Sequence, residues 1–558
     1  MRSGEFPEVA SVALTILGTL LLAVSLAFAH LRLDGFGLVG SLPLTYYVGL
    51  ACLPLASSLL WTRQRGAAIL VAGLLIFVLF VWLTPLVLEG EPRFRTSYLS
   101  YGYVDPIVRG QGLQPDRFFY HNWPLFPLLF GGIVSAVHLQ PLVLMGWFPA
   151  VIMLLYLAPL AGLLRLTTGP IRERVPQAWA AGLWLFLVFD WTGQDYFSPQ
   201  ALSYLMFLGW AWLLAWVALR RDGQFARRHV AVAIALYGLI VLTHVLTALL
   251  ALGALAALTM AGMLRRPSLI VTTAVMFVGW QVYVAAPFFA FYGPHLVQAL
   301  LAAQDFLLLN LTNRIAGAPE HETVATLRVV AAILAFGIGA LGAARFLRDR
   351  PIPRETRFAI VFLLGIAIIA PVSVYGGEML IRILLFSLPM LAVLTLRAFD
   401  AAPIRTVLAA SLLVAAPLHM VTHYGNELYD YVSPGEVTGY ELIAERLAPA
   451  NIYGAYPAGV FLRSATLDSR NVFPPTASTQ LALNAFRDPA RAAWLHRTWP
   501  IYVAVSRGDD AAATLFYNDP TFVERLLAQL AREPDRFRLV YRNPDIAIYR
   551  WVGPPPVK

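Results

Sequence analysis

A polar loop between two long apolar segments carries the first candidates for chemistry. Residues 89–122 hold four acidic side chains, four arginines and one histidine. Asp105 lies within this loop in Tyr101-Gly-Tyr-Val-Asp105-Pro106, where a carboxylate could take a proton from a hydroxyl nucleophile. The alternative is that Asp105 caps a short surface helix, with Pro106 at its first position.

A second acidic residue stands just before another apolar segment. The stretch Gly193-Gln194-Asp195-Tyr196-Phe-Ser198-Pro-Gln200 places polar side chains where a membrane helix is expected to begin. Ser198 and the following proline suit a helix N-cap, and Asp195 lies further out than that cap requires. We therefore predict that Asp195, with its neighbours Gln194 and Tyr196, belongs to a functional site.

Cationic and imidazole side chains complete the set of candidates. Arg382 follows Glu378 by four residues, so the simplest account is an ion pair within one helix. An arginine near the apolar region is also a suitable phosphate ligand, because its guanidinium group forms paired bonds to phosphate oxygens. Arg109, His121 and His244 are further candidates for substrate binding. For the two histidines, helix packing or interfacial hydrogen bonding is the alternative.

Composition sets the class of protein. Of 558 residues, 59% are hydrophobic and 13% are charged, which excludes an ordinary soluble domain and indicates a polytopic membrane protein. The single cysteine, Cys52, lies in an apolar run and allows neither a disulfide framework nor a cysteine metal site. The net charge of +9 fits basic loops beside anionic lipid, and no aromatic-interleaved basic patch suggests nucleic-acid binding.

Apolar segments long enough to cross a bilayer recur along the first three quarters of the chain. We predict about thirteen spanning helices, at 9–31, 41–61, 67–88, 141–164, 175–190, 199–219, 229–243, 245–263, 269–292, 323–346, 357–373, 380–397 and 405–423. The short apolar segment 124–138 is predicted to lie along the outer surface instead, so that the outer loop region runs from 89 to 140. Counting it as a span would move a cluster of arginines to the outside.

If 124–138 does not cross the membrane, most loop arginines fall on one side of it. The predicted cytoplasmic loops hold 18 arginines, against seven in the loops predicted to lie outside. This places the N-terminus in the cytoplasm and the C-terminus outside. The predicted transmembrane domain covers 1–423, and residues 424–558 form a small extra-cytoplasmic α/β domain.

The fold of that C-terminal domain follows from its local patterns. Residues 436–447 and 521–532 are predicted helices, while 501–506, 537–542 and 546–551 are predicted strands. No phosphate loop, metal-ligand spacing or nucleophile elbow is recognisable there, so catalysis by this domain alone is not expected.

In this arrangement the chain resembles the GT-C glycosyltransferase superfamily of polytopic enzymes that use polyprenyl-phosphate-linked sugars. Asp105 in the large outer loop, the 124–138 segment, Asp195 in the next outer loop, Arg382 near the outer end of a late helix and the 424–558 domain carry the resemblance. Each motif is short. The loop here follows the third span, so the first two helices form an added hairpin.

The resemblance implies transfer of a hexose or pentose, with inversion, from a polyprenyl-phosphate donor to a glycan, lipid or protein acceptor. The reaction is expected on the outer face of a bacterial cytoplasmic membrane. Asp105 would act as the base with Glu91 as the fallback, Arg382 would hold the donor phosphate, and Asp195 would orient the sugar or acceptor. Whether a divalent metal ion takes part stays open.

Two other classes of function stay open. In a transporter or lipid-carrier flippase the same charges would mark a translocation path, although we find no repeated half and no matched pair of broken helices. A non-catalytic partner in envelope polysaccharide assembly is the second alternative.

Overall fold

A computed structural model gives the arrangement of the chain. It describes residues 6–290, 311–347, 351–367, 378–454, 467–471 and 498–553, together with positions 293, 297, 483, 486–491 and 495. The ends of two predicted spans, 291–292 and 368–373, lie outside these described residues, as does part of 424–558.

Helices dominate the first 424 residues, and every predicted span contains one. In chain order they are α1 (Phe6–Ala27), α2 (Leu44–Ser58), α3 (Ala67–Glu89), α4 (Arg95–Val108), α5 (Leu125–Val137), α6 (Pro141–Thr167), α7 (Ala178–Phe189), α8 (Pro199–Ala218), α9 (Arg227–Val241), α10 (Val245–Met260), α11 (Pro267–Gly279), α14 (Pro319–Leu347), α15 (Arg354–Ala367), α16 (Met379–Arg397) and α17 (Ala402–Tyr424).

Eight of the described helices are long and apolar enough to cross a membrane, counting α11 together with the π-helical turn that continues it to Val284. The other five predicted spans hold shorter helices, namely α2, α7, α9, α10 and α15. Of these, α7 has 12 residues and is about 18 Å long, against a hydrocarbon core of roughly 30 Å. The chain is a polytopic helical membrane protein, and the total of thirteen spanning helices stays a prediction.

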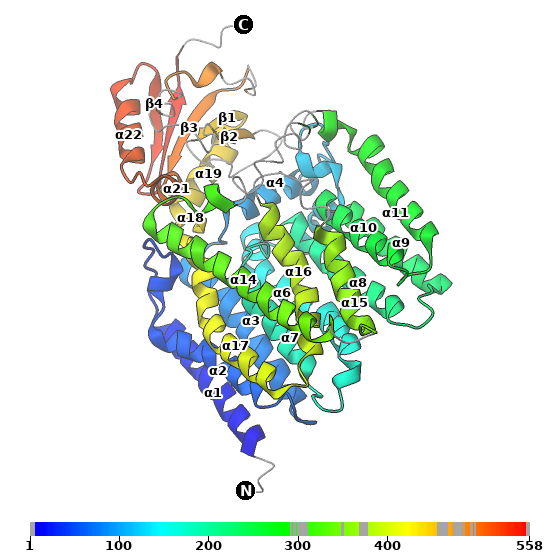
Figure 1. Cartoon of the computed structure of the whole chain (residues 1–558). Helices are drawn as coiled ribbons and strands as arrows, with labels where there is room; N and C mark the ends of the chain where they lie inside the picture. Colours follow the sequence, from blue (N-terminus) through cyan, green and yellow to red (C-terminus); the bar gives the residue numbers. More distant parts are fainter. Residues whose placement is uncertain are drawn as a thin grey trace.

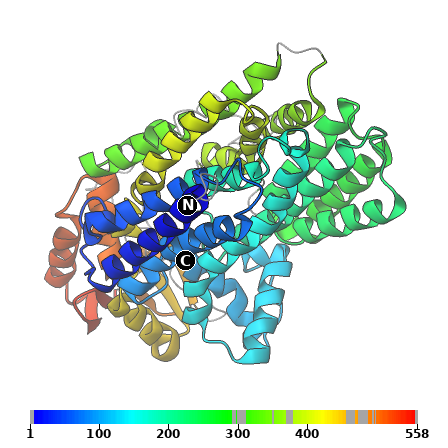
Figure 2. The same cartoon turned by 90° about the horizontal axis from the view of Figure 1, so that it is seen from below.

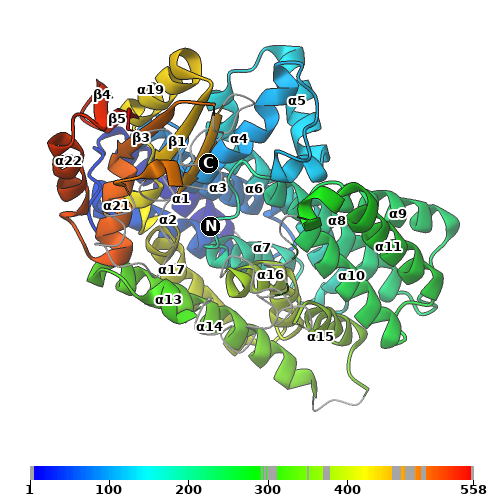
Figure 3. The same ribbon diagram turned by 90° about the horizontal axis from the view of Figure 1, so that it is seen from above.

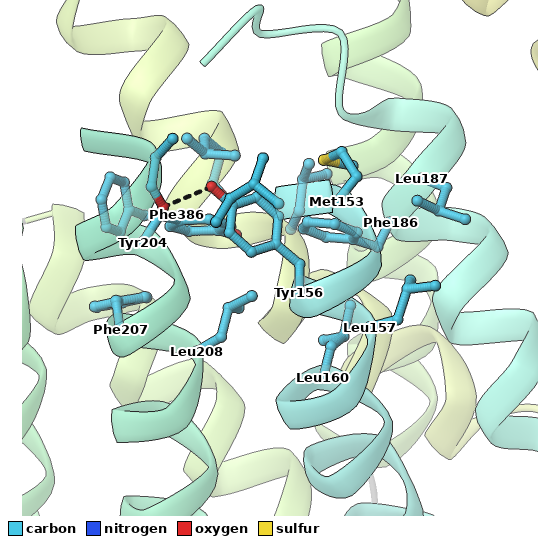
Figure 4. Close-up of a cluster of buried hydrophobic side chains, with 14 of the residues drawn as sticks. Met153, Tyr156, Leu157, Leu160, Phe186, Leu187, Tyr204, Phe207, Leu208 and Phe386 are labelled. Carbon is cyan, nitrogen blue, oxygen red and sulfur yellow. Dashed lines mark hydrogen bonds between the residues drawn. The ribbon is translucent and has the colours of Figure 1, made fainter. Parts of the chain in front are cut away.

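Buried apolar side chains join the central helices. Helix α16 is buried along most of its length, and its Phe386 meets side chains of α6, α7 and α8 in the core drawn in Figure 4. Tyr156 and Tyr204 in this cluster donate hydrogen bonds to the backbone oxygens of Ala201 and Leu385, at 2.7 Å and 2.8 Å, so their hydroxyl groups are satisfied. Seen from below, helices α9 to α11, drawn in green, project to one side of this core (Figure 2).

Two short helices lie at one end of the bundle. Helix α4 packs on α5, and Figure 3 shows the pair beside β1 and α19. The approach is close, since a Cβ atom at Gly131 would lie 2.6 Å from Ile107. Helix α5 has 13 residues, and the surface position of 124–138 stays a prediction.

The C-terminal region forms a five-stranded sheet in the order β2-β1-β3-β5-β4. Strands β3 (Ile501–Ser506), β4 (Phe537–Arg542) and β5 (Ile546–Trp551) have the predicted bounds. The predicted helices are also present, as α19 (Pro434–Leu442), continued by a π-turn to Leu447, and α22 (Phe522–Arg532). The parallel strands β1 (Ala450–Gly454) and β2 (Leu467–Asn471) and helix α21 (Arg507–Tyr517) were not predicted.

The two faces of this sheet pack differently. Ala504 and Ile548 belong to the core that continues into the helical bundle, whereas Val503 and Ala547 pack with Leu526 of α22. This alternation follows from the two-residue period of a strand. Figure 1 shows the sheet at the end of the bundle opposite the N-terminus, and the placement of the two termini on opposite sides of a membrane stays a prediction.

Candidate active site

The segment between α7 and α8 directs consecutive side chains to different neighbours. Ser198 caps α8, because its side-chain oxygen accepts a hydrogen bond from the backbone N–H of Ala201 at 3.2 Å, as predicted. Asp195 takes no part in this cap. It is buried, accepts a hydrogen bond from Trp82 Nε1 on α3, and lies 3.4 Å from His423 Nε2 on α17.

Asp195 is held in its ionised form. Burial raises its pKa, but the nearby His423 and Arg93 outweigh burial and bring the pKa to about 2. Its second oxygen, Oδ1, is buried and accepts no hydrogen bond from the described residues. A buried anionic oxygen without a donor is costly, so this atom is suited to accept a hydrogen bond from a ligand.

The next residue, Tyr196, faces helix α4. Its ring stacks on Phe94 with centroids 4.5 Å apart and an interplanar angle of 29°. Phe94 precedes α4 with a φ of 71°, which a bulky side chain rarely adopts and which marks a constrained position. Nearby, Gln194 Oε1, Gln200 Nε2 and Trp191 Nε1 are buried without hydrogen-bond partners among the described residues. The segment therefore offers several unused polar atoms.

Arg382 lies in the first turn of α16 with only 10% of its side chain exposed. Its guanidinium group contacts Glu378 Oε2 at 2.9 Å, so the predicted ion pair within the helix is present. Glu378 also lies 3.3 Å from Arg314, so its carboxylate contacts two arginines. The charges of Glu378 and Arg382 both act on Tyr196, which places the cluster beside the 190–198 segment.

His244 belongs to the same region. It caps α10, since its Nδ1 accepts a hydrogen bond from the backbone N–H of Thr247 at 3.3 Å. Its ring lies nearly parallel to that of Tyr120, with centroids 6.1 Å apart. Burial, followed by the positive charge of Arg382, lowers the pKa of His244 to about 3. His244 is therefore neutral and lies close to Arg382.

His121 is engaged within its own loop. Nδ1 accepts a hydrogen bond from the backbone N–H of Gln114 at 2.8 Å, so Nε2 carries the proton and donates to the Tyr103 backbone oxygen at 2.7 Å. Burial lowers the pKa of His121, which favours this neutral form. The arrangement fits loop positioning, the alternative to its predicted role in binding.

Asp105 lies on α4, and Arg109 lies at the C-terminal end of that helix. Asp105 is inside α4 rather than at its start, so the alternative of a helix cap at Asp105-Pro106 was wrong, and Phe94 precedes the helix instead. The Asp105 carboxylate, 16% exposed, pairs at 2.7 Å with Arg109, which is 62% exposed. Glu91 lies just beyond α3, and burial, then the charge of Glu441, raises its pKa. Among the described residues, no hydrogen bond or ion pair joins Asp105 to Asp195 or Arg382.

The sequence did not indicate an ionic network that ties the outer loop to the C-terminal region. Arg93 forms a bidentate pair with Glu427 at 2.8 Å and 2.6 Å and also contacts Asp430 at 3.2 Å. Arg95 pairs with Glu436 at 2.9 Å, and both side chains are buried. Glu436 in turn accepts a hydrogen bond from the backbone N–H of Gly508 at 3.1 Å. This network fixes the start of α4 against the sheet domain.

Removing one partner of the Arg95–Glu436 pair should destabilise the protein. Arg95→Ala leaves the Glu436 carboxylate buried without its cation, and breaking such a pair costs about 3–5 kcal/mol. The apparent melting temperature in detergent should fall by several degrees. Arg109→Ala removes an exposed partner, which is worth roughly 1 kcal/mol or less, and should leave the melting temperature nearly unchanged. Equal shifts for the two variants would contradict the assigned importance of the buried pair.

Metal ligation was left open by the sequence. Within the described part of the chain, no group of three or more His, Cys, Asp or Glu side chains is arranged to hold a metal ion.

Comparisons with known proteins gave structural likenesses only. No protein-family model and no curated protein matches the sequence. The structure is similar to ArnT from Cupriavidus metallidurans bound to undecaprenyl phosphate, at 14% identity and a TM-score of 0.47, over 87% of this chain and 98% of that one. It is also similar to the Archaeoglobus fulgidus oligosaccharyltransferase in complex with Zn and sulfate, at 13% identity and a TM-score of 0.43, over 86% and 72% of the two chains. For ArnT in the apo state the TM-score is 0.33 at 14% identity, over 87% and 98%. Because these TM-scores lie below 0.5, we infer the function from this chain's own residues.

Proposed function

We propose that the chain is a GT-C type glycosyltransferase of the cytoplasmic membrane. It moves a hexosyl or pentosyl group from a polyprenyl-phosphate donor to an acceptor on the outer face, with inversion at the anomeric carbon. The acceptor is a hydroxyl group of a glycan, lipid or protein.

One observation carries this proposal. Segments far apart in the sequence meet along residues 195–196: Asp195, whose Oδ1 has no donor among the described residues, faces α3 and α17, and the charge of the mostly buried Arg382 acts on the next residue, Tyr196. A sugar phosphate needs both kinds of partner, because its hydroxyl groups donate hydrogen bonds to carboxylates and its phosphate accepts them from arginine. We assign sugar orientation to Asp195, assisted by Gln194 and Tyr196, and phosphate binding to Arg382, with Glu378 and His244 beside it.

The proposed reaction is a single displacement. The acceptor oxygen bonds to the anomeric carbon as the bond from that carbon to the phosphate oxygen breaks, and the polyprenyl phosphate leaves. A carboxylate takes the hydroxyl proton, while Arg382 stabilises the charge on the departing phosphate. Asp195, with its pKa of about 2, is a weak base and suits orientation better. Asp105 therefore stays the proposed base with Glu91 as the fallback, and Arg109 sets the position of Asp105.

A transporter or flippase is the competing function, and a non-catalytic assembly partner is the third. The polar groups assigned here gather at one end of the bundle, which suits chemistry at one membrane face better than a path across it. Proteoliposomes carrying a labelled polyprenyl-phosphate sugar in one leaflet separate the three. We expect sugar to be transferred to an added acceptor without movement of the donor between leaflets. Movement without transfer would indicate a flippase, and neither result would indicate a non-catalytic partner.

The outer-face location makes a separate prediction about topology. In a Cys52→Ser background, single cysteines at the exposed positions Gln111 and Asp535 should react with a membrane-impermeant thiol reagent in intact cells. A cysteine at Gln64, which is exposed in the loop after α2, should react only after the membrane is opened. Labelling at position 64 alone in intact cells would reverse the proposed orientation.

A further inference from the structure

An arginine-lined cavity lies at the end of the helical bundle away from the candidate active site. Its volume is ≈ 330 Å³. It is formed where the loops after α8 and α10 meet the start of α15, and α10 packs against both α8 and α15. The described residues that line it are Arg221, Gly262, Met263, Arg265, Ile352, Arg354 and Arg357.

Helix direction separates this cavity from the active site. Helix α8 starts after Ser198 and ends before the loop that carries Arg221, and its 20 residues span about 30 Å. Helix α10 starts after His244 and ends before Arg265, and its 16 residues span about 24 Å. The cavity therefore lies on the face predicted to be cytoplasmic, and its proposed role does not depend on the glycosyltransferase assignment.

The cavity concentrates positive charge. Four of its lining residues are arginines, and none of the described lining residues is acidic. The two carboxylates adjacent in sequence to lining residues contact arginines that are not among the described lining residues: Asp222 lies 3.5 Å from Arg220, and Glu355 lies 3.9 Å from Arg397. Arginines this close repel one another, and an anion between them removes that repulsion.

Two of the arginines are held in place by the backbone. Arg354 Nε donates a hydrogen bond to the Ala218 carbonyl oxygen at 2.6 Å, and Arg357 donates to that of Ala261 at 2.5 Å. Ala218 is the last residue of α8 and Ala261 is the C-cap of α10, and cations are favoured at such helix ends. Arg221 and Arg265 are exposed and make no such bond among the described residues. The first pair shapes the cavity, and the second pair has donors available for a ligand.

We propose that this cavity is a binding site for a phosphate group, presented either by an anionic lipid headgroup or by a free phosphate. Guanidinium groups form paired, charge-assisted hydrogen bonds with phosphate oxygens. Basic pockets between helices on the cytoplasmic side are suited to anionic headgroups. The cavity volume is at the lower end of the range for small-ligand sites.

Titration of the purified full-length protein in detergent tests this proposal. The probes are short-chain phosphatidylglycerol, inorganic phosphate and short-chain phosphatidylcholine, with apparent dissociation constants taken from ligand-dependent shifts in melting temperature. Phosphatidylglycerol or inorganic phosphate should stabilise the wild-type protein, and phosphatidylcholine should not. Arg221→Gln/Arg265→Gln should weaken that binding at least about tenfold, because it removes two charged donors.

A matched control removes two arginine charges from a different loop. Arg63→Gln/Arg65→Gln changes the loop after α2, on the same predicted face, and should bind the probes as the wild type does. Binding of phosphatidylglycerol alone would identify a lipid ligand, and equal binding of inorganic phosphate would identify a free phosphate. The proposal is overturned if neither probe binds the wild type, or if both double variants lose affinity equally.

Discussion

Arg382→Lys is expected to weaken binding of a polyprenyl-phosphate sugar by about tenfold or more. Lysine keeps the positive charge but loses the planar fork that forms two bonds to a phosphate, and this makes it a poor replacement at such a site. The loss should appear in a direct donor-binding assay, for example with a fluorescent polyprenyl-phosphate sugar.

Glu378→Gln is the matched control for that experiment. It removes the ion-pair partner at 2.9 Å but leaves the guanidinium group for the phosphate, so its effect on donor binding should be clearly smaller. If the two substitutions behave alike, Arg382 and Glu378 form a structural pair only. The phosphate site would then have to be sought at Arg314 or Arg109, because Arg93 and Arg95 are bound to buried carboxylates.

Asp105→Asn should lower turnover by roughly 100-fold or more and leave donor binding largely intact. The amide cannot accept the proton of the acceptor hydroxyl group, and a general base contributes effects of this size. Single-turnover transfer from a saturating donor is the measurement, since it separates the chemical step from binding.

Glu91→Gln is the competing variant. If Glu91 is the base, Glu91→Gln should lower turnover by roughly 100-fold or more instead, and Asp105→Asn should be nearly as active as the wild type. Burial raises the pKa of Glu91, so the rate would then fall with decreasing pH before an ordinary glutamate is protonated. Full activity in both single variants would exclude both assignments.

The elements that sequence predicted best are short runs rich in β-branched and aromatic residues. Strands β3, β4 and β5 have the expected bounds, and Asn543-Pro544-Asp545 marks the turn between the last two. Strand β1 is buried throughout, and β2 reads Leu-Asp-Ser-Arg-Asn. Neither shows an alternating pattern, so their parallel pairing could not be anticipated from local sequence.

The candidate site was predictable as residues but not as contacts. Asp195 and Arg382 stand out because ionisable groups at membrane depth are costly and normally pair with each other or serve a site. Their partners do not, since Trp82 lies 113 positions from Asp195. Glu427 is likewise 334 positions from Arg93. Such pairs depend on how the helices pack, which a local sequence pattern does not predict. For Asp105 the local pattern itself misled: Asp105-Pro106 suggested the start of a helix, and the structure places Asp105 inside α4.

Release of free polyprenyl phosphate by the purified protein tests the central claim most directly. A panel of polyprenyl-phosphate-linked hexoses and pentoses would be incubated with the protein and a hydroxyl acceptor, and the lipid products resolved by mass spectrometry. We predict that at least one donor is converted to polyprenyl phosphate with sugar on the acceptor, and that Arg382→Lys slows this conversion. A wild-type protein that binds such a donor tightly but releases no polyprenyl phosphate with any acceptor would contradict the glycosyltransferase assignment.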